Sequence, residues 1–307
     1  MEFRPEGCIY DSAENQNYIS SPEGLSEAME KGIILEARAV RCTSRHDLIV
    51  ELPCAKGIIP RNEGALGIDD GKTKDIAVIS RVNKIVCFTV SSISLSDEGE
   101  VIVSLSRKNA QLRCMNDYIS VLKSGDIISA MVTHLEKFGS FVDIGCGIPS
   151  LIPIDSMSVS RISHPSDRFY VGQLIKAIVK TNENERIYLT HKELLGTWTE
   201  NASCFSEGET VPGIVRSIED YGIFVELTPN LAGLAEPRSG IHSGQSVSVY
   251  IKAIIPEKMK VKLVIVDVCG NEFSLLHENK YFINDTHISE WIYSPPGSGK
   301  DISTLFI

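Results

Sequence analysis

The sequence predicts an all-β protein in which three tandem five-stranded barrels are joined by short helical connectors. Two observations carry this prediction. One pattern of residues occurs three times along the 307-residue chain. Each copy holds about five short β-rich runs that are separated by turn residues. The composition, with 43% hydrophobic and 23% charged residues, is that of a globular chain with buried cores.

The second and third copies align without a gap over their first halves. Residues 125–144 read GDIISAMVTHLEKFGSFVDI, and residues 208–227 read GETVPGIVRSIEDYGIFVEL, with six of the twenty positions identical. A weaker first copy lies upstream, around residues 48–60, and closes with the run at 101–106. This much ordered correspondence indicates three versions of one structural unit.

In the second copy we expect strands near 126–134, 140–145, 149–153, 173–180 and 186–190. Alternation along the second of these places Phe141 and Asp143 on one side and Val142 and Ile144 on the other. Five short strands with a long third connection favour a small, closed Greek-key barrel of the OB type.

The predicted domains follow from the repeats. They are an acidic N-terminal segment (1–27), a divergent repeat (28–108), a connector (109–122), the second repeat (123–192), a connector (193–205), the third repeat (206–268) and a C-terminal extension (269–307). Within the extension, residues 280–283 look strand-like. We expect the extension either to fold back on the third repeat or to await a partner.

The formal charge of −10 argues against a nucleic-acid partner until it is divided along the chain. Residues 1–27 carry −5 and residues 269–307 carry −3, whereas the three repeats are close to neutral. Binding depends on the local field more than on the total charge, so a polyanionic partner remains compatible with the sequence.

Other functional classes lack support in the sequence. The eight cysteines form no Cys-x-x-Cys pair and no Cys/His cluster with zinc-ligand spacing, so neither a metal nor a cofactor is expected. No apolar run is long enough to span a bilayer, and the first residues do not resemble a signal peptide, so we expect a cytoplasmic protein without membrane contact. Residues 296–301 (PGSGKD) miss the phosphate-loop pattern, and no enzyme is predicted.

Four segments of the second copy together resemble the S1 RNA-binding domain family. They are FGSFVDIG at 138–145, LIP at 151–153, VGQ at 171–173 and RIYLT at 186–190. The resemblance extends over roughly residues 28–268 and weakens from the second repeat to the third and then the first. The first repeat, with KGIIP at 56–60, resembles the divergent opening repeats of the ribosomal protein S1 family.

The resemblance implies an OB-fold that binds single-stranded RNA on one barrel face. The family's aromatic pair maps onto Phe138 and Phe141, and its arginine on the closing strand maps onto Arg186. Pro153 stands where the family usually has a histidine, and Asn182 replaces an acidic residue near the last turn. These departures concern base specificity more than binding itself.

The residues themselves favour the same chemistry, because single-stranded RNA offers base faces to aromatic rings and phosphates to cations. The third repeat keeps both rings but surrounds them with acidic side chains, so weaker contact is expected there. The first repeat has His46 and Ile49 at the ring positions. The candidate RNA-binding residues are His134, Lys137, Phe138, Phe141, Arg161, His164, Arg168, Arg186, Tyr188, Tyr221, Phe224 and Lys260.

The sequence therefore predicts a non-catalytic protein that binds single-stranded RNA, mRNA above all, in translation or mRNA handling. The alternative is an interaction adaptor that uses its OB barrels to contact the ribosome or RNA-processing proteins. The acidic termini and the ring-poor first repeat favour this alternative.

Overall fold

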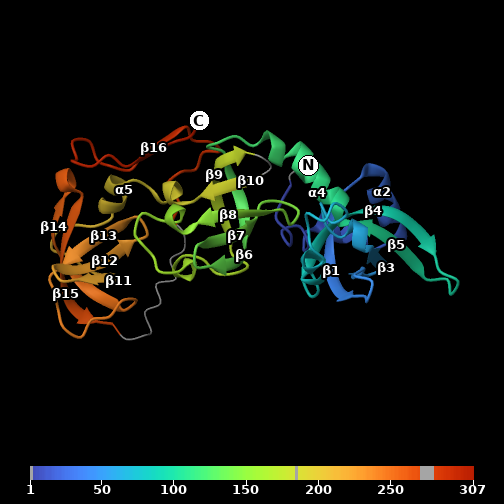
Figure 1. The fold of residues 1–307 in the computed structure, drawn as a ribbon, viewed down its shortest axis with the longest axis horizontal. Coiled ribbons are helices and arrows are strands. Elements are labelled where there is room, and N and C mark those ends of the chain that lie inside the picture. The colour runs from blue at the N-terminus through green and yellow to red at the C-terminus, as the bar shows by residue number, and fades with distance from the viewer. Residues whose placement is uncertain (1–2, 184–185, 270–279) are drawn as a thin grey trace. The chain divides into compact units, whose positions relative to one another are not determined.

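The computed structural model describes residues 3–183, 186–269 and 280–307 (Figure 1). It confirms the predicted fold class, with three closed five-stranded barrels and few helices. The chain forms two compact units. The first holds residues 1–122 together with 143–149, and the second holds residues 123–142 and 150–307.

The first barrel has the strand order β1-β2-β3-β5-β4. Its strands are β1 (Leu35–Cys42), β2 (Leu48–Leu52), β3 (Ala55–Ile59), β4 (Ile85–Leu95) and β5 (Val101–Ser106). Two helices that the sequence analysis did not anticipate precede it, α1 (Ala13–Ile19) and α2 (Pro22–Lys31), and a short α3 (Ile76–Ile79) lies before β4. Leu25 and Ala28 of α2 are buried in the core of this barrel, which explains why the acidic segment is ordered.

The second barrel repeats this topology in the order β10-β8-β7-β6-β9. Its strands lie within a few residues of the predicted ones: β6 (Ile127–Glu136), β7 (Gly139–Asp143), β8 (Pro149–Pro153), β9 (Leu174–Glu183) and β10 (Arg186–Thr190). Val142 and Ile144 are buried and Phe141 is half-exposed, as the predicted alternation along β7 requires. Asp143, which was predicted on the side of Phe141, is also buried, because its carboxylate accepts the backbone N–H groups of Glu6 and Gly145.

The third barrel has the order β11-β12-β13-β15-β14. It consists of β11 (Thr210–Glu219), β12 (Gly222–Thr228), β13 (Leu231–Ala235), β14 (Ser246–Ile255) and β15 (Lys260–Val268). Helical connectors precede the second and third barrels as predicted. They are α4 (Arg107–Asp117) with a 3-10 turn at Ile119–Val121, and a 3-10 turn at Lys192–Leu195 followed by α5 (Trp198–Ala202).

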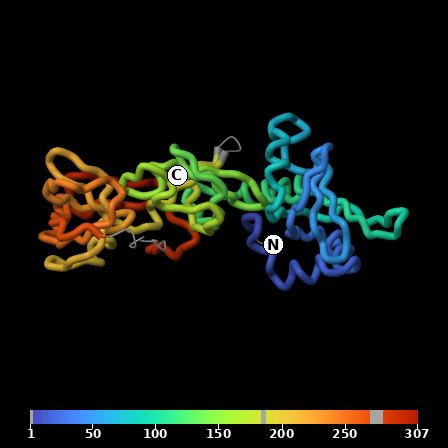
Figure 2. Tube along the Cα trace, turned by 90° about the horizontal axis from the view of Figure 1, so that it is seen from below, coloured from blue at the N-terminus to red at the C-terminus, as the bar shows by residue number. Residues whose placement is uncertain are grey.

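Residues 280–307 fold back within the second unit and contact both of its barrels (Figures 1 and 2). Residues 280–283 form no strand, which corrects the prediction; the strands are instead β16 (Glu290–Ile292) and β17 (Ser303–Leu305). Trp291 and Tyr293 are buried in the core of the third barrel. Phe306 packs with Ile178 and Leu194, beside the second barrel. The remainder of the predicted extension, residues 270–279, lies outside the described residues.

A buried ion pair holds the first unit together. Both side chains are nearly inaccessible, and the Arg107 guanidinium donates to Glu6 through two nitrogens, Nε at 2.7 Å and Nη2 at 3.1 Å. Burial by itself would raise the pKa of Glu6, but Arg107 and Arg81 hold it below its usual range. The backbone N–H of Glu6 also donates to the Asp143 carboxylate at 2.7 Å, which ties the 143–149 segment into this unit.

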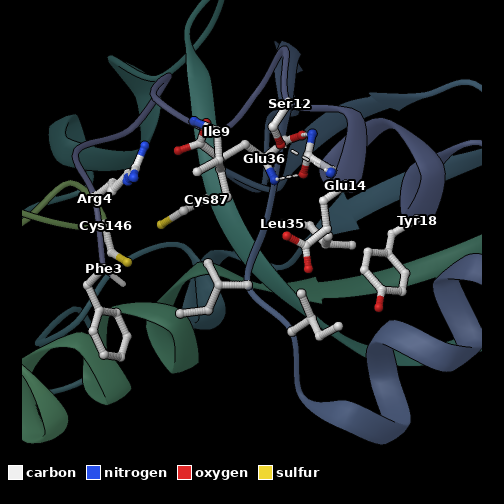
Figure 3. A pocket seen from close by; sticks show the side chains of 13 residues that line it. Phe3, Arg4, Ile9, Ser12, Glu14, Tyr18, Leu35, Glu36, Cys87 and Cys146 are labelled. Carbon is white, nitrogen blue, oxygen red and sulfur yellow. Dashed lines mark hydrogen bonds between the residues drawn. The ribbon is translucent and has the colours of Figure 1, made fainter. Parts of the chain in front are cut away.

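The same unit contains a cavity of about 590 Å³ between the N-terminal residues and the first barrel (Figure 3). Glu36 lies in its wall, where its carboxylate accepts the backbone N–H groups of Gly7 and Ile9. Burial nevertheless raises the pKa of Glu36 to about 7. Since these bonds already use both carboxylate oxygens, we assign the cavity wall a structural role.

The second unit contains a fully buried imidazole, that of His191. Its Nδ1 lies 3.1 Å from the carbonyl oxygen of Met157, and its ring contacts Phe169 and Tyr281 edge-on. Burial lowers the pKa of His191 to about 4, from an ordinary 6.5. In the unfolded chain His191 is therefore protonated below about pH 6.5, whereas in the folded unit it stays neutral down to about pH 4.

We expect the second unit to lose stability as the pH falls from about 6.5 to about 4, by up to about 3 kcal/mol. Both tryptophans, Trp198 and Trp291, lie in this unit, so their fluorescence during urea unfolding at each pH measures the effect. The variant His191→Gln should flatten the slope over this window. An equal slope in the variant and the parent would contradict the assignment.

Candidate RNA-binding face

The outer face of the second barrel carries a cluster of rings at the β6–β7 hairpin. The Phe138 and Phe141 rings meet edge to face with their centroids 5.9 Å apart. His134 stacks on Phe141 at 6.4 Å and an interplanar angle of 27°. On the neighbouring strands, Tyr188 of β10 lies opposite Leu151 of β8 in the parallel register. The structure thus brings together three of the predicted residues, His134, Phe138 and Phe141, in one ring cluster.

Close packing of the backbone creates this arrangement. A Cβ atom on Gly139 would lie 2.6 Å from the carbonyl oxygen of Ile152, so only glycine allows β7 to approach β8 here. The carbonyl of Phe138 accepts the N–H of Ile154 at 3.0 Å, which fixes the backbone that carries the outer ring. The close contact between the two strands is therefore the reason for a glycine at this position.

The rings are available to solvent to different degrees. Phe138 is 55% and Tyr188 is 38% exposed, while Phe141 is half-buried beneath its neighbours. Lys137 is exposed in the hairpin turn, and Nε2 of His134 lies 2.8 Å from Oε1 of Glu136. The predicted Arg186 begins β10, but its side chain lies outside the described residues.

The third barrel repeats the ring pair and replaces the tyrosine. Tyr221, 68% exposed, meets Phe224 edge to face at 6.2 Å. Phe224 lies opposite Leu234, which in turn lies opposite Lys262. Lys262 therefore occupies the place that Tyr188 has in the second barrel, and the predicted Lys260 is exposed two residues earlier.

The first barrel lacks rings at the corresponding places. There Ile49 lies opposite Ile58, and Ile58 opposite Ser104, so the row has isoleucine and serine where the second barrel has phenylalanine and tyrosine. His46 adopts a left-handed backbone conformation with φ of 67° and lies 3.5 Å from Asp75. Of the three barrels, the second has the fullest set of stacking groups among the described side chains.

The long β8–β9 connection carries three of the predicted RNA-binding residues, and they differ in their exposure to solvent. Arg161 is exposed, whereas His164 is half-buried and caps a short helical turn by accepting the N–H of Ser166 at 3.1 Å. The side chain of Arg168 is only 1% exposed, and its Nη2 donates to Glu226 of the third barrel at 2.6 Å. Because reaching RNA would break these bonds, we leave Arg168 out of the contact surface.

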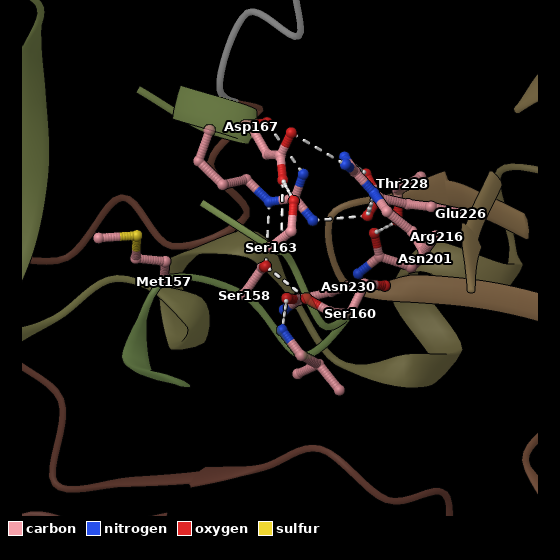
Figure 4. A network of polar contacts seen from close by, with 12 residues as sticks. Met157, Ser158, Ser160, Ser163, Asp167, Asn201, Arg216, Glu226, Thr228 and Asn230 are labelled. Carbon is pink, nitrogen blue, oxygen red and sulfur yellow. Dashed lines mark hydrogen bonds and ion pairs between the residues drawn. The ribbon is translucent and has the colours of Figure 1, made fainter. Parts of the chain in front are cut away.

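Glu226 is the centre of a polar network that the sequence analysis did not recognise (Figure 4). Glu226 is one of the acidic side chains that surround the ring pair of the third repeat in the sequence. Its carboxylate instead accepts bonds from both Arg168 and Arg216, and Arg216 also pairs with Asp167 at 3.3 Å. Glu226 aligns with Asp143 and the structure buries both, but nothing in the sequence marked either carboxylate as buried.

Among the described residues no helix is of a length and hydropathy suited to crossing a membrane. Across the same parts of the chain, His, Cys, Asp and Glu side chains form no group of three that could hold a metal ion.

Comparison with known proteins places the ring cluster in a recognised segment. Residues 121–192, which include the second barrel, match the family model described as S1 RNA binding domain. The small ribosomal subunit protein bS1 of Staphylococcus aureus (strain COL) is 32% identical over 270 residues, which cover 81% of this chain and 65% of that protein. The protein of the same name from Rhizobium meliloti is 30% identical over 192 residues, or 56% of this chain and 33% of that one.

The chain thus spans between a third and about two thirds of the length of these relatives. Among solved structures, a multidomain protein with nucleic acid binding domains from Streptococcus pneumoniae is 12% identical with a TM-score of 0.26, over 76% of this chain and 72% of that one. At that score the likeness adds nothing to the strand topology described above.

Proposed function

Because the chain belongs to the S1 RNA-binding domain family, we propose that it is a non-catalytic protein that binds single-stranded RNA in translation or mRNA handling. One observation carries the proposal. Within the segment that matches the family model, the β6–β7 hairpin of the second barrel gathers the rings of Phe138, Phe141 and His134 in one cluster.

Such a face suits RNA for a physical reason. Base faces stack on aromatic side chains whatever their sequence, and each stacked base contributes about 1–3 kcal/mol. Phe138 is exposed enough to receive a base, while Phe141 supports it from the side. In this proposal the exposed Lys137 contacts the phosphate backbone, and Arg186 is proposed as a second phosphate contact. Tyr221 and Phe224 form the weaker, second platform in this proposal.

The proposed partners follow from the relatives, which are named as proteins of the small ribosomal subunit. We therefore propose mRNA as the RNA and the ribosome as the assembly, in the cytoplasm. The near-neutral charge of the second repeat is compatible with this partner even though the whole chain carries −10.

The direct test is fluorescence anisotropy of the whole chain with a labelled single-stranded RNA at several salt concentrations. We expect the logarithm of the association constant to fall linearly with the logarithm of the salt concentration, with a slope of about −0.7 per phosphate contact. A duplex RNA of the same length is the control and should bind more weakly, since its bases are not free to stack. Absence of binding, or equal binding of the duplex, would contradict the proposal.

A second candidate function is that of a protein-interaction adaptor. It is favoured by the first barrel, where Ile49, Ile58 and Ser104 stand at the positions that carry stacking rings in the second barrel. In that case the chain should retain ribosomal or RNA-processing proteins in a pull-down after nuclease treatment. The retention should also survive replacement of both Phe138 and Phe141 by alanine.

A further inference from the structure

The buried carboxylate of Glu226 lies beside the ring pair of the third barrel. Along β12, Phe224 and Glu226 are separated by one residue, and Val225 between them is fully buried. Alternate residues of a strand point to the same side, so both side chains start from the outer face, about 7 Å apart. Whatever packs on Glu226 therefore borders the platform of Tyr221 and Phe224.

The neighbour that packs there is the β8–β9 connection of the second barrel. Besides the bond from Arg168 to Glu226, the N–H of Ser160 donates to the carbonyl of Pro229 at 3.0 Å, and the N–H of Val159 donates to the Asn230 side chain at 3.0 Å. Arg168 is fixed in turn by a bond of 2.9 Å from its Nε to Ser158 Oγ. Backbone and side-chain bonds together hold the connection against the third barrel.

The network also removes a charge that would oppose RNA. An ionised Glu226 on the same face as Phe224 would repel phosphates. Here two guanidinium groups, of Arg168 and Arg216, balance the two carboxylates of Glu226 and Asp167, so the cluster is neutral overall. Arg161 is exposed on the same connection and carries one further positive charge.

We propose that the ring pair of the third barrel and the β8–β9 connection of the second barrel form one composite site for single-stranded RNA. Tyr221 and Phe224 stack the bases, and Arg161 contacts a phosphate. Arg168 and Glu226 are positioning residues that hold the connection beside the rings. This inference rests on the proposed function and explains how an acidic repeat can take part in it.

The experiment measures anisotropy at low salt with a labelled uridine oligomer of about 20 nucleotides, longer than one OB-fold site of about 4–16 nucleotides. Arg161→Ala should weaken binding about three-fold to five-fold, the size of one phosphate ion pair. The matched control Lys31→Ala removes an exposed positive charge from α2 and should leave affinity unchanged. Since Arg161 is exposed, its variant should fold like the parent, which circular dichroism checks.

Three further variants separate position from charge. Arg168→Gln leaves the cluster with one excess negative charge, Glu226→Gln leaves one excess positive charge, and the double variant is neutral again but lacks the ion pair. If the Arg168–Glu226 ion pair positions the connection, the double variant binds the oligomer as weakly as the single variants. Adding Arg161→Ala to the double variant then causes no further loss of affinity. Full recovery of affinity in the double variant would show that charge alone matters and would overturn the positioning role.

The two proposals fail in different ways. If the parent chain does not bind single-stranded RNA, the proposed function is lost and the composite site with it. If the parent binds and loses affinity on replacement of Phe138 and Phe141, while Phe224→Ala and Arg161→Ala are both silent, the composite site alone is overturned.

Discussion

Replacing Phe138 and Phe141 together by alanine is expected to weaken the binding of single-stranded RNA by about 100-fold, since each lost stacking contact costs about 1–3 kcal/mol. Both rings lie on the outer face, and the barrel core consists of other residues such as Val142 and Ile152. The variant should therefore keep its fold. Fluorescence anisotropy of the whole chain, with the parent measured beside it, gives the ratio of dissociation constants.

The matched comparison is the double replacement of Tyr221 and Phe224 by alanine in the third barrel. It removes an equivalent ring pair with the same edge-to-face geometry, 6.2 Å against 5.9 Å between centroids. We expect a smaller loss, about 10-fold, because Lys262 stands in place of Tyr188 and fewer rings are involved. Equal losses would mean that the two platforms contribute alike, and no loss at Phe138 and Phe141 would remove the basis of the proposed function.

Replacing Arg107 by methionine is expected to destabilise the first unit by about 3–5 kcal/mol, because it leaves the buried Glu6 carboxylate without its cation. The loss includes the bond from Arg107 Nη1 to the carbonyl of Gly64. Hydrogen exchange of the β1 and β4 amides is the suitable measurement. Tryptophan fluorescence would not follow this unit, since Trp198 and Trp291 both lie in the other.

Two companion variants test the cause. Adding Glu6→Gln to Arg107→Met removes the stranded charge, so most of the lost stability should return. Breaking the exposed pair of Lys31 and Glu27 on α2 should cost less than about 1 kcal/mol. A small effect of Arg107→Met by itself would show that Glu6 finds another partner or takes up a proton.

The barrels could be predicted because their signals are local. Strand alternation at Phe141 and Val142, turn residues, and the match of 125–144 to 208–227 all lie within short stretches of sequence. The ring cluster could be predicted for the same reason. Phe138 and Phe141 lie on one hairpin, and strand alternation alone places Phe141 on the outer face.

What could not be predicted depends on contacts between distant segments. Arg168 looks like any loop cation until the third barrel supplies Glu226, 58 residues away, and buries it. The helix α2 had local signals, with Ser21 capping its first turn and Gly32 in a left-handed conformation at its end. Its acidic composition concealed the apolar side that Leu25 and Ala28 bury. Tyr281 and Ile283 account for the apolar character of residues 280–283: they pack against Ile178 and Leu194 without forming a strand.

The return of residues 280–307 across both barrels of the second unit has a consequence for the order of folding. Thr304 donates to Glu193 at 2.9 Å, and Phe306 packs on Leu194, so these contacts join positions more than 100 residues apart. At a synthesis rate of about 5–20 residues per second, residues 304–306 are made roughly 5–20 seconds after the second barrel is complete. During that interval the nascent chain exposes an apolar surface that the finished protein covers, which makes this stage of synthesis the most open to aggregation or to capture by a chaperone.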